Sequence, residues 1–469
     1  MTAPNSSSSS RVKPRQDHGF TLIELMVALT GSLFFTIFVF MLSRDVSRFF
    51  QAQSRTSDTT LAAISGFERL RTDIARAGFL ASPNLSRDIN RCPRPTSGST
   101  AAIPQQVGTQ FDTYPGLQQM ALLGIASSPA ALTALPFYAT LNNAKINPDV
   151  LTLYGNYASS EQFPVRSVDF DSNPVSIVLE QESPALLRVG VKTSTTDAAG
   201  TAILGRIFKA GGILRVVDET GRDQYSVING VSFVSGVSTV TLSNALALVQ
   251  KGNANVCGIR GHAAGLAINP VNIIRYAIVD VGSSFATHHP QLSYLFGGEV
   301  PPYDGTRLEL MRYELPPTVG SGDSILGVNW PGTGTSITSM GELVAEYAVD
   351  LKFGLTVLSN TQVGGITTIA ETASPSNYAG IPYESPANGQ VSTSTTFGPH
   401  FIRGVHARLS VRYRDADRET SILADPSDPT VTAQQLFRVK VSATPEEFAR
   451  TRSFRGYIST RNTQNSMWN

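Results

Sequence analysis

The feature that most constrains this chain is an apolar run near its N-terminus, residues 20–42, which holds a single charged residue, Glu24. At about 1.5 Å per residue, a helix of this length extends roughly 35 Å, enough to cross the hydrocarbon core of a bilayer with some tilt. Arg11, Lys13 and Arg15 precede the run, and positive charge beside a membrane segment stays on the cytoplasmic side. We therefore expect one membrane crossing, with the remainder of the chain exported.

Glu24 is unusual, because an ionisable group within a spanning segment is costly unless it lies shallow, is neutral or has a partner. One interpretation is an ordinary signal anchor in which Glu24 reaches the headgroup zone. The other starts from the hexapeptide Gly19-Phe20-Thr21-Leu22-Ile23-Glu24. Cleavage after Gly19 would create an amine on Phe20, and this cation would neutralise Glu24 of a neighbouring subunit inside the membrane.

The same residues resemble the start of type IV pilins and pseudopilins. In that superfamily the leader ends in Gly, is cut by prepilin peptidase on the cytoplasmic side, and leaves a Phe that is N-methylated. The resemblance implies cleavage between Gly19 and Phe20, N-methylation of Phe20 and an assembly role for Glu24. An ordinary secretory peptide would place small residues after its apolar region, where this chain has Ser43-Arg44-Asp45. We expect the leader 1–19 to be removed and the anchor to stay attached.

The helical pattern continues beyond the membrane half, and no proline occurs between residues 20 and 82. An apolar stripe is expected to pack on the body through Val46, Phe49, Phe50, Gln53, Leu61, Ile64, Phe67, Leu70 and Ile74. Small residues in the membrane half, Thr30, Gly31 and Thr36, mark where close helix approach is easiest, or merely tolerate lipid. We therefore expect one long helix, with its membrane half over 20–42 and its periplasmic half over 43–80.

The end of this helix carries its own signals. Gly78 supplies the left-handed residue that ends a helix, and Asp73 has Arg69 and Arg76 as partners at helical spacing. The segment 70–79 resembles the corresponding helix end of PilW-like minor pilins, with its Asp-Ile followed by Ala-Gly-Phe. This resemblance narrows the expected family from pilins in general to PilW-like minor pilins.

Residues 81–148 are rich in Pro, Ser, Ala and Thr and predict a loop-rich insertion before a β-rich head over 149–469. Strand patterns recur at 149–154, 213–217, 225–234, 237–242, 273–280, 307–315, 346–355, 402–413 and 436–442. In the clearest strand, apolar residues alternate with polar ones: Val405, Ala407, Leu409, Val411 and Tyr413 against His406, Arg408, Ser410, Arg412 and Arg414. A small β subdomain is expected over 205–250, with a hairpin turn at Asp218-Glu219-Thr220-Gly221.

Several segments, at 149–153, 348–351, 405–409 and 457–462, also resemble PilW-like ones in order, whereas 81–145, 156–205 and 356–398 look like enlarged insertions. The expected fold class is therefore α+β. A long N-terminal pilin helix packs on an antiparallel sheet that carries large β-rich and loop insertions.

The composition is that of a folded exported body, with 41% hydrophobic and 16% charged residues and a formal charge of +1. Removing the leader takes three basic residues and Asp17 from totals of 37 and 36, which leaves 34 basic against 35 acidic residues. This balance argues against nucleic-acid binding. The two cysteines, Cys92 and Cys257, both lie in the exported part. Either they form a disulfide, or they are two separate buried thiols.

The sequence contains no Gly-x-Ser-x-Gly elbow, no phosphate-binding Gly-x-x-x-x-Gly-Lys loop and no His-Glu-x-x-His pair. His288 and His289 are adjacent and lack a nearby Cys or carboxylate, which favours a surface pair over a zinc site. A weak calcium candidate has the spacing of an EF-hand loop, comprising Asp169, Asp171, Asn173 and Glu180. Pro174 stands where that loop requires glycine, so a polar turn is the simpler interpretation. We expect no enzyme activity and no cofactor.

The resemblance implies a minor pilin of a type IV pilus, which helps to initiate assembly or forms part of the tip complex. Its expected partners are other minor pilins, the major pilin, prepilin peptidase, the inner-membrane assembly platform and a tip adhesin. The expected location is the inner membrane, single-pass with a periplasmic head, and then the pilus tip. Two alternatives remain: a J-type pseudopilin of a type II secretion system, and a membrane-tethered adhesin or binding protein that needs neither cleavage nor Glu24.

Overall fold

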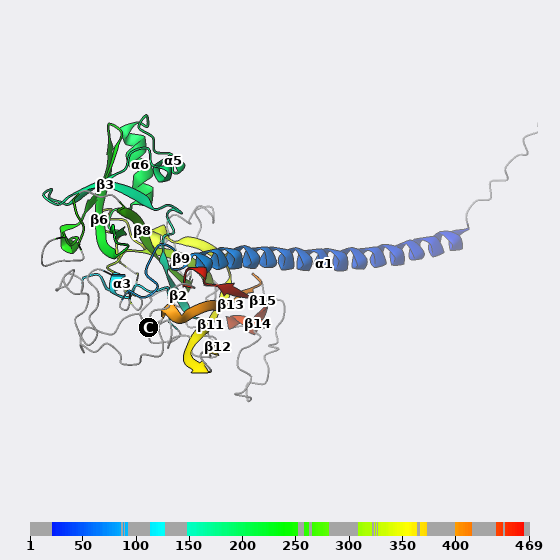
Figure 1. Cartoon of the computed structure of the whole chain (residues 1–469). Coiled ribbons are helices and arrows are strands. Elements are labelled where there is room, and N and C mark those ends of the chain that lie inside the picture. The colour runs from blue at the N-terminus through cyan, green and yellow to red at the C-terminus, as the bar shows by residue number, and fades with distance from the viewer. Residues whose placement is uncertain are drawn as a thin grey trace, which may run out of the picture. The chain divides into compact units, whose positions relative to one another are not determined.

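The computed structural model describes residues 21–85, 88, 90–91, 113–126, 148–251, 258–261, 265–280, 308–320, 323, 325, 327–363, 366–372, 399–414, 438–443 and 446–463. The chain divides into two compact units, Met1–Asp58 and Thr59–Asn469. Helix α1 (Leu22–Arg76) begins in the first unit and ends in the second (Figure 1). The predicted long N-terminal helix is therefore confirmed.

In the first unit, α1 is an apolar helix with its side chains exposed. The stretch Leu22–Ser47 has 26 residues and a mean hydropathy of 2.3, and none of it is buried. Every described side chain from residue 21 to residue 50 is exposed. Length and composition therefore suit one crossing of a bilayer.

In the second unit, α1 packs on a sheet through one face. Its buried residues Ala63, Phe67, Leu70 and Ile74 follow helical spacing and share a core with strand residues such as Leu351, Phe353, Leu355, Val405, Ala407 and Leu409. The helix therefore covers the five-stranded sheet described next, as the fold class predicted.

The predicted stripe is wrong at six positions, where the side chains are exposed: Val46, Phe49, Phe50, Gln53, Leu61 and Ile64. The buried face includes a small residue, Gly66, beside Phe67, Leu70 and Ile74. A Cβ atom at Gly66 would lie 2.7 Å from Cβ of Ala345, so the helix approaches strand β10 (Glu342–Glu346) closely at that glycine. A sequence pattern based on large apolar residues does not detect a close contact made by a glycine.

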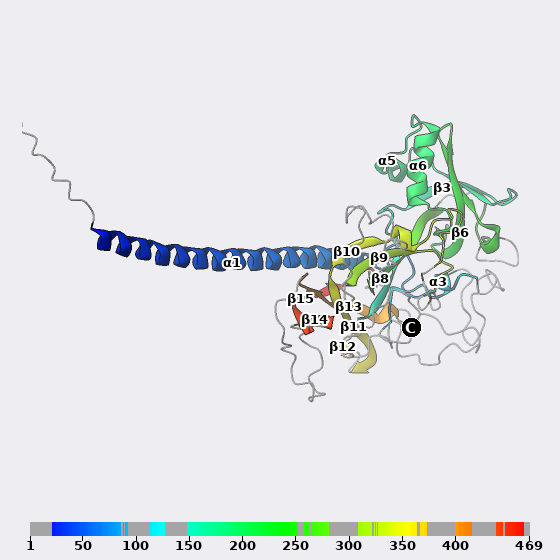
Figure 2. The ribbon, with the colours of Figure 1, turned by 180° about the vertical axis from the view of Figure 1, so that it is seen from behind.

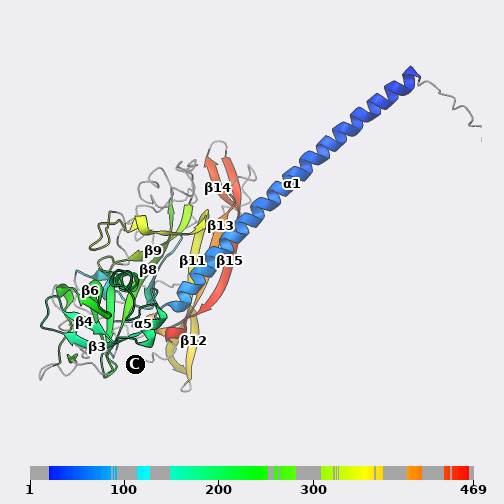
Figure 3. The ribbon, with the colours of Figure 1, turned by 90° about the horizontal axis from the view of Figure 1, so that it is seen from above.

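The smaller sheet has five antiparallel strands in the order β12-β11-β13-β15-β14 (Figure 3). Their bounds are β11 Ala348–Val363, β12 Ile366–Thr372, β13 Ile402–Arg412, β14 Arg438–Ala443 and β15 Glu446–Ser459. The apolar positions predicted to alternate along β13 are buried, from Val405 to Tyr413. This alternation is confirmed and faces the α1 core.

The opposite face of β13 is less solvated than predicted. His406 and Arg414 are exposed, but Ser410 and Arg412 are buried. The guanidinium carbon of Arg412 lies 4.9 Å from the ring centroid of Tyr347. Nη1 of Arg412 also donates to the carbonyl oxygens of Tyr413 (3.1 Å) and Arg414 (2.9 Å). These contacts stabilise the buried guanidinium of Arg412, which the alternating sequence pattern had predicted to be exposed to solvent.

The larger sheet has ten antiparallel strands in the order β1-β2-β8-β3-β4-β7-β6-β5, with β9 pairing β8 and β10 pairing β9 (Figure 2). Their bounds are β1 Leu123–Ala126, β2 Val150–Gly155, β3 Phe163–Asp169, β4 Ser176–Leu179, β5 Ile213–Val217, β6 Asp223–Val234, β7 Val237–Leu242, β8 Ala267–Asp280, β9 Leu308–Leu315 and β10 Glu342–Glu346. The short helices are α3 Pro115–Gln118, α5 Pro184–Arg188 and α6 Asp197–Ile207, with 3-10 turns η1 Asn244–Leu246, η3 Thr338–Met340, η5 Pro399–Phe401 and η6 Arg461–Thr463.

Six strands of the larger sheet close into a ring, because β5 also pairs with β8. Strand β8 joins the ring to the rest of the sheet. Its residues 267–271 pair with β3 and β5, and its residues 272–280 pair with β2 and β9. The ring encloses its own core, to which α5 and α6 contribute Leu186 and Leu204. Helix α6 packs on β6, and α5 contacts β3 (Figure 1).

The strands predicted at 213–217 and 237–242 are confirmed as β5 and β7. The predicted hairpin turn is also confirmed, since Gly221 has a φ of +80° and its N–H donates to the carbonyl oxygen of Asp218 at 3.0 Å. The stretch 205–250 does not form a core of its own, because it shares one with β3, β4, α5 and β8. The three consecutive strands β5, β6 and β7 cannot close a ring by themselves. Strands β3 and β4, from the stretch 156–205 that looked like an insertion, complete the ring with β8.

Candidate assembly site

The N-terminus of α1 is stabilised by a reciprocal capping box formed by Thr21 and Glu24. The backbone N–H and the hydroxyl of Thr21 both donate to Oε2 of Glu24 at 3.0 Å. The backbone N–H of Glu24 donates to Oγ1 of Thr21 at 3.3 Å. The carboxylate thereby satisfies an N-terminal donor and complements the positive end of the helix dipole.

Thr21 was missed by the sequence reasoning, although the Thr-x-x-Glu spacing is a known signature of a helix start. The local partner leaves Glu24 exposed, so its carboxylate is accessible to a further cation. Gly19 and Phe20, the predicted cleavage residues, lie outside the described residues, and their roles stay predictions.

The polar side chains of the apolar helix bond within the helix itself. The Thr30 hydroxyl donates to the Met26 carbonyl oxygen at 3.0 Å, and the Thr36 hydroxyl donates to the Ser32 carbonyl oxygen at 2.7 Å. A Cβ atom at Gly31 would meet no atom within 4 Å. The hydroxyl groups have hydrogen-bond partners within the helix, and Gly31 leaves space on its surface. This surface therefore suits contact with lipid or with a second helix.

Asp73 joins the second part of α1 to the larger sheet. It is 3% exposed, and its Oδ2 accepts from Nε of Arg312 at 2.7 Å and from the Tyr276 hydroxyl at 2.8 Å. Burial, together with the Asp73 carboxylate, raises the pKa of Tyr276, so its hydroxyl stays protonated and donates. The predicted pairing of Asp73 with Arg69 or Arg76 is wrong, because the buried face of the helix brings Asp73 to β8 and β9.

The two arginines bind elsewhere. Nη2 of Arg69 lies 3.1 Å from Oε2 of Glu342, and Nη2 of Arg76 donates to the carbonyl oxygen of Asn156 at 2.8 Å. Glu342 also lies 3.4 Å from Nη1 of Arg312. Helix α1 is therefore fixed to β8, β9 and β10 through one connected network.

The end of α1 is held from two sides. Gly78 has a φ of +72°, and its N–H donates to the carbonyl oxygen of Tyr154 at 2.7 Å. Nδ2 of Asn462 donates to the carbonyl oxygen of Ala77 at 2.9 Å. The helix ends at Arg76, which confirms the stop signal predicted at Gly78. The segments 70–79 and 457–462, from opposite ends of the chain, thus meet at the helix terminus.

The calcium candidate lies in a polar turn between β3 and β4. Oδ1 of Asp169 accepts from the backbone N–H of Asp171 at 3.0 Å, and Asn173 accepts from the side chain of Asn244. Glu180 is exposed immediately after β4. Within the described part of the chain, no group of three or more His, Cys, Asp or Glu side chains could hold a metal ion. These bonds suit the polar turn that the sequence offered as the simpler interpretation.

Other residues singled out in the sequence lie outside the described residues. These are Cys92, Cys257, His288 and His289. The disulfide between Cys92 and Cys257 stays a prediction.

A buried ionic cluster fixes the segment after α1 to the β5–β6 hairpin. Nη2 of Arg215 lies 2.8 Å from Oδ1 of Asp223, and the Tyr225 hydroxyl donates to Oδ2 of Asp223 at 3.5 Å. Asp88 and Arg91 are buried beside this pair, and Arg91 forms a parallel bridge with Asp223. Burial raises the pKa of Asp223 to about 6, although Arg215 opposes this shift. Burial also raises the pKa of Asp88.

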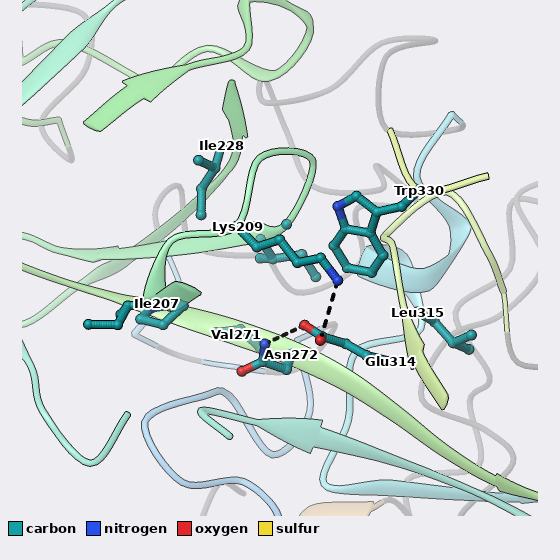
Figure 4. Close-up of a pocket in the computed structure, with 11 residues that line it drawn as sticks. Ile207, Lys209, Ile228, Val271, Asn272, Glu314, Leu315 and Trp330 are labelled. Atoms are coloured by element: carbon teal, nitrogen blue, oxygen red, sulfur yellow. Dashed lines mark hydrogen bonds and ion pairs between the residues drawn. The ribbon is translucent and has the colours of Figure 1, made fainter. Parts of the chain in front are cut away.

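A second polar cluster lies where the loop after α6 meets β9 (Figure 4). Nζ of Lys209 lies 3.5 Å from the ring centroid of Trp330 and 3.6 Å from Oε2 of Glu314. Nδ2 of Asn272 donates to Oε1 of Glu314 at 2.8 Å. The cavity among these residues is about 10 Å³. That space fits one water molecule, so the cluster joins two segments of the head and offers no room for a substrate.

One family model matches the chain: the prokaryotic N-terminal methylation motif, over residues 14–30. The chain therefore carries a type IV prepilin-like N-terminus, which indicates a type IV pilin-like or pseudopilin protein. The motif implies processing by prepilin peptidase and, together with the single apolar helix, is consistent with membrane anchoring. It also favours a structural role over catalysis. No curated protein and no solved structure matches the chain.

Proposed function

We propose that this chain is a minor pilin of a type IV pilus that helps to initiate assembly and forms part of the tip complex. The observation that carries the proposal is the start of α1, where Glu24 stands exposed on an apolar helix within the matched methylation motif, residues 14–30. The resemblance of residues 70–79 and 457–462 to PilW-like minor pilins supports the pilus over other pilin-type machines.

In this proposal, charge pairing selects how subunits dock. Cleavage after Gly19 creates an amine on Phe20, and that cation pairs with Glu24 of a neighbouring subunit inside the membrane. Thr21 holds the Glu24 carboxylate at the first turn of α1 until the neighbour docks. An unpaired carboxylate in hydrocarbon is costly, so only a neighbour in the matching register relieves that cost.

The size of the second unit, Thr59–Asn469, supports a place at the tip. A filament in which every subunit carried such a head would be crowded, whereas a tip position relieves the crowding. Before assembly, the proposed location is the inner membrane with a periplasmic head. The proposed partners are other minor pilins, the major pilin, prepilin peptidase, the assembly platform and a tip adhesin. Adhesion and twitching motility would then depend on the chain through pilus assembly.

The second candidate is a J-type pseudopilin of a type II secretion system, because the methylation motif and the apolar helix fit it equally well. The third is a membrane-tethered adhesin. Native cells without the chain distinguish all three: loss of surface pili with normal protein secretion supports the minor pilin, and the reverse supports the pseudopilin. Normal piliation and secretion with weaker attachment supports the tether.

A further inference from the structure

The smaller sheet has an open groove on the face opposite the α1 core. Its volume is about 480 Å³, and strands β11, β13 and β15 line it. Successive side chains on a strand point to opposite faces, so the neighbours of the core residues Phe353 and Ala407 point into this groove. Two adjacent cross-strand rows form its surface.

The first row is made of three cations. Lys352 pairs with Arg408, and Arg408 pairs with Arg455, across neighbouring strands. Nζ of Lys352 lies 2.9 Å from Oδ1 of Asp149, and Nη2 of Arg408 lies 2.8 Å from Oδ2 of Asp350. Both carboxylates are buried, whereas Arg455 is exposed. Asp149 and Asp350 therefore compensate Lys352 and Arg408 and fix their positions, and Arg455 is the exposed end of the row.

The second row is aromatic. Tyr457 is 52% exposed, and its ring centroid lies 5.0 Å from that of His406. A Cβ atom at Gly404 would overlap the Tyr457 ring, so the ring lies across the backbone of β13 at that glycine. Gly354, which pairs with His406, has no side chain to fill the groove. The groove therefore presents a half-exposed aromatic face beside the cations.

These two rows fit an extended acidic peptide. Neighbouring strands are about 4.8 Å apart, so the cation row is roughly 10 Å long. Side chains on one side of an extended peptide recur about every 7 Å, so carboxylates at positions i and i+2 lie within reach of the row. A guanidinium fork binds a carboxylate through two hydrogen bonds, and an apolar side chain of the same peptide would pack on Tyr457.

We propose that this groove binds an acidic, extended segment of a partner protein through Arg455, Arg408 and Lys352, with Tyr457 as its apolar contact. The inference goes beyond the proposed function, because it concerns residues of the second unit alone and does not require helix packing or leader cleavage.

The test measures fluorescence anisotropy of a labelled peptide of alternating glutamate and glycine, titrated with the full-length protein in neutral detergent micelles. We expect a Kd in the micromolar range that rises with salt. Arg455→Glu should raise the Kd about tenfold or more, because it reverses the exposed charge of the row. Gly404→Ala should raise it several-fold without any change in charge, since the added Cβ displaces Tyr457.

The matched control is Arg452→Glu, the same charge change on the same strand. Arg452 is exposed and pairs with the buried Val411, so it lies on the opposite face of the sheet. It should leave the Kd within about twofold. No binding by the wild type, or equal losses in both arginine variants, would overturn the proposal. Binding of an oligogalacturonate in place of the peptide, with the same dependence on Arg455, would assign the groove to an anionic glycan and overturn it too.

Discussion

Glu24 and Asp73 stand on the same helix, but their surroundings are opposite. Glu24 is exposed, and it accepts hydrogen bonds from Thr21, three residues away in the same turn. Asp73 is buried, and its partners Tyr276 and Arg312 come from strands more than 200 residues away in the sequence. Glu24 therefore has its hydrogen-bond partner within α1, whereas the partners of Asp73 lie in strands of the head.

This difference distinguishes a carboxylate that is accessible to another subunit from one that stabilises the fold. A carboxylate bound by distant strands fixes the helix to the sheet and is no longer accessible. A carboxylate that bonds only within its own turn remains accessible, although it sits in an apolar helix where an unpaired charge is unfavourable. We therefore propose that Glu24 serves subunit docking, and we infer that Asp73 stabilises the head.

The largest expected effect comes from Glu24→Ala. We expect recovery of partner pilins with the tagged chain, and the number of surface pili, to fall about tenfold or more, because the docking charge is lost. Thermal unfolding of the head, followed by circular dichroism, should not change. The matched control is Glu68→Ala, an exposed carboxylate on the same helix that lies 3.2 Å from Arg71. Unchanged piliation in Glu24→Ala would contradict the assignment.

Asp73→Ala, in contrast, should destabilise the head. Removing Asp73 deprives Arg312 of its buried carboxylate and leaves it the half-exposed Glu342, 3.4 Å away. We expect the head to lose about 3 kcal/mol of stability. Glu68→Ala serves again as control and should stay within about 0.5 kcal/mol. Chemical unfolding of both variants in detergent measures the difference. If Asp73→Ala were as stable as the control, the network at the helix would not be what fixes α1 to the sheet.

Gly78→Ala tests whether the helix end contributes separately. Gly78 has a φ of +72°, and a Cβ atom there would lie 2.7 Å from Cδ1 of Leu122. We expect a loss of about 2–3 kcal/mol from backbone strain and this contact. Gly31→Ala, in the apolar half of α1, adds a Cβ that meets no atom within 4 Å and should leave head stability unchanged. Equal unfolding midpoints for the two variants would show that the left-handed turn is not required.

The smallest expected effect concerns pH. The folded-state pKa of Asp223 is raised from 3.8 to about 6, so its contribution to stability is complete below the lower value and is lost as pH rises through the higher one. Asp223→Asn removes this titration. Relative to wild type, the variant should therefore become more stable by about 2 kcal/mol between pH 4 and pH 7. The opposite trend would mean that the ion pair with Arg215 outweighs burial.

The sequence was sufficient to predict features encoded by neighbouring residues. The long helix, its stop at Gly78, the strands at 213–217 and 237–242 and the hairpin turn between β5 and β6 all follow from local periodicity or backbone preference. The α+β class followed from the same signals. For the candidate site, the exposed position of Glu24 on an apolar helix agrees with the predicted anchor.

Features that depend on distant contacts were not predictable in this way. The partner of Asp73 comes from β9, and helical spacing pointed instead to Arg69 and Arg76. The buried face of α1 depends on the close approach of Gly66 to Ala345, which no count of large apolar residues detects. The sequence predicted a strand at 175–179, which is β4, but strand β3 lies in a stretch without a strong pattern and becomes a strand by completing the ring with β8.

The most direct test of the central claim is the intact mass and N-terminal residue of the protein extracted from its native membrane. The account predicts a chain that begins at N-methylated Phe20, with the leader 1–19 removed. A chain that keeps its leader would contradict the account, because no Phe20 amine would then exist to pair with Glu24, and the membrane-tethered binding protein would become the better explanation.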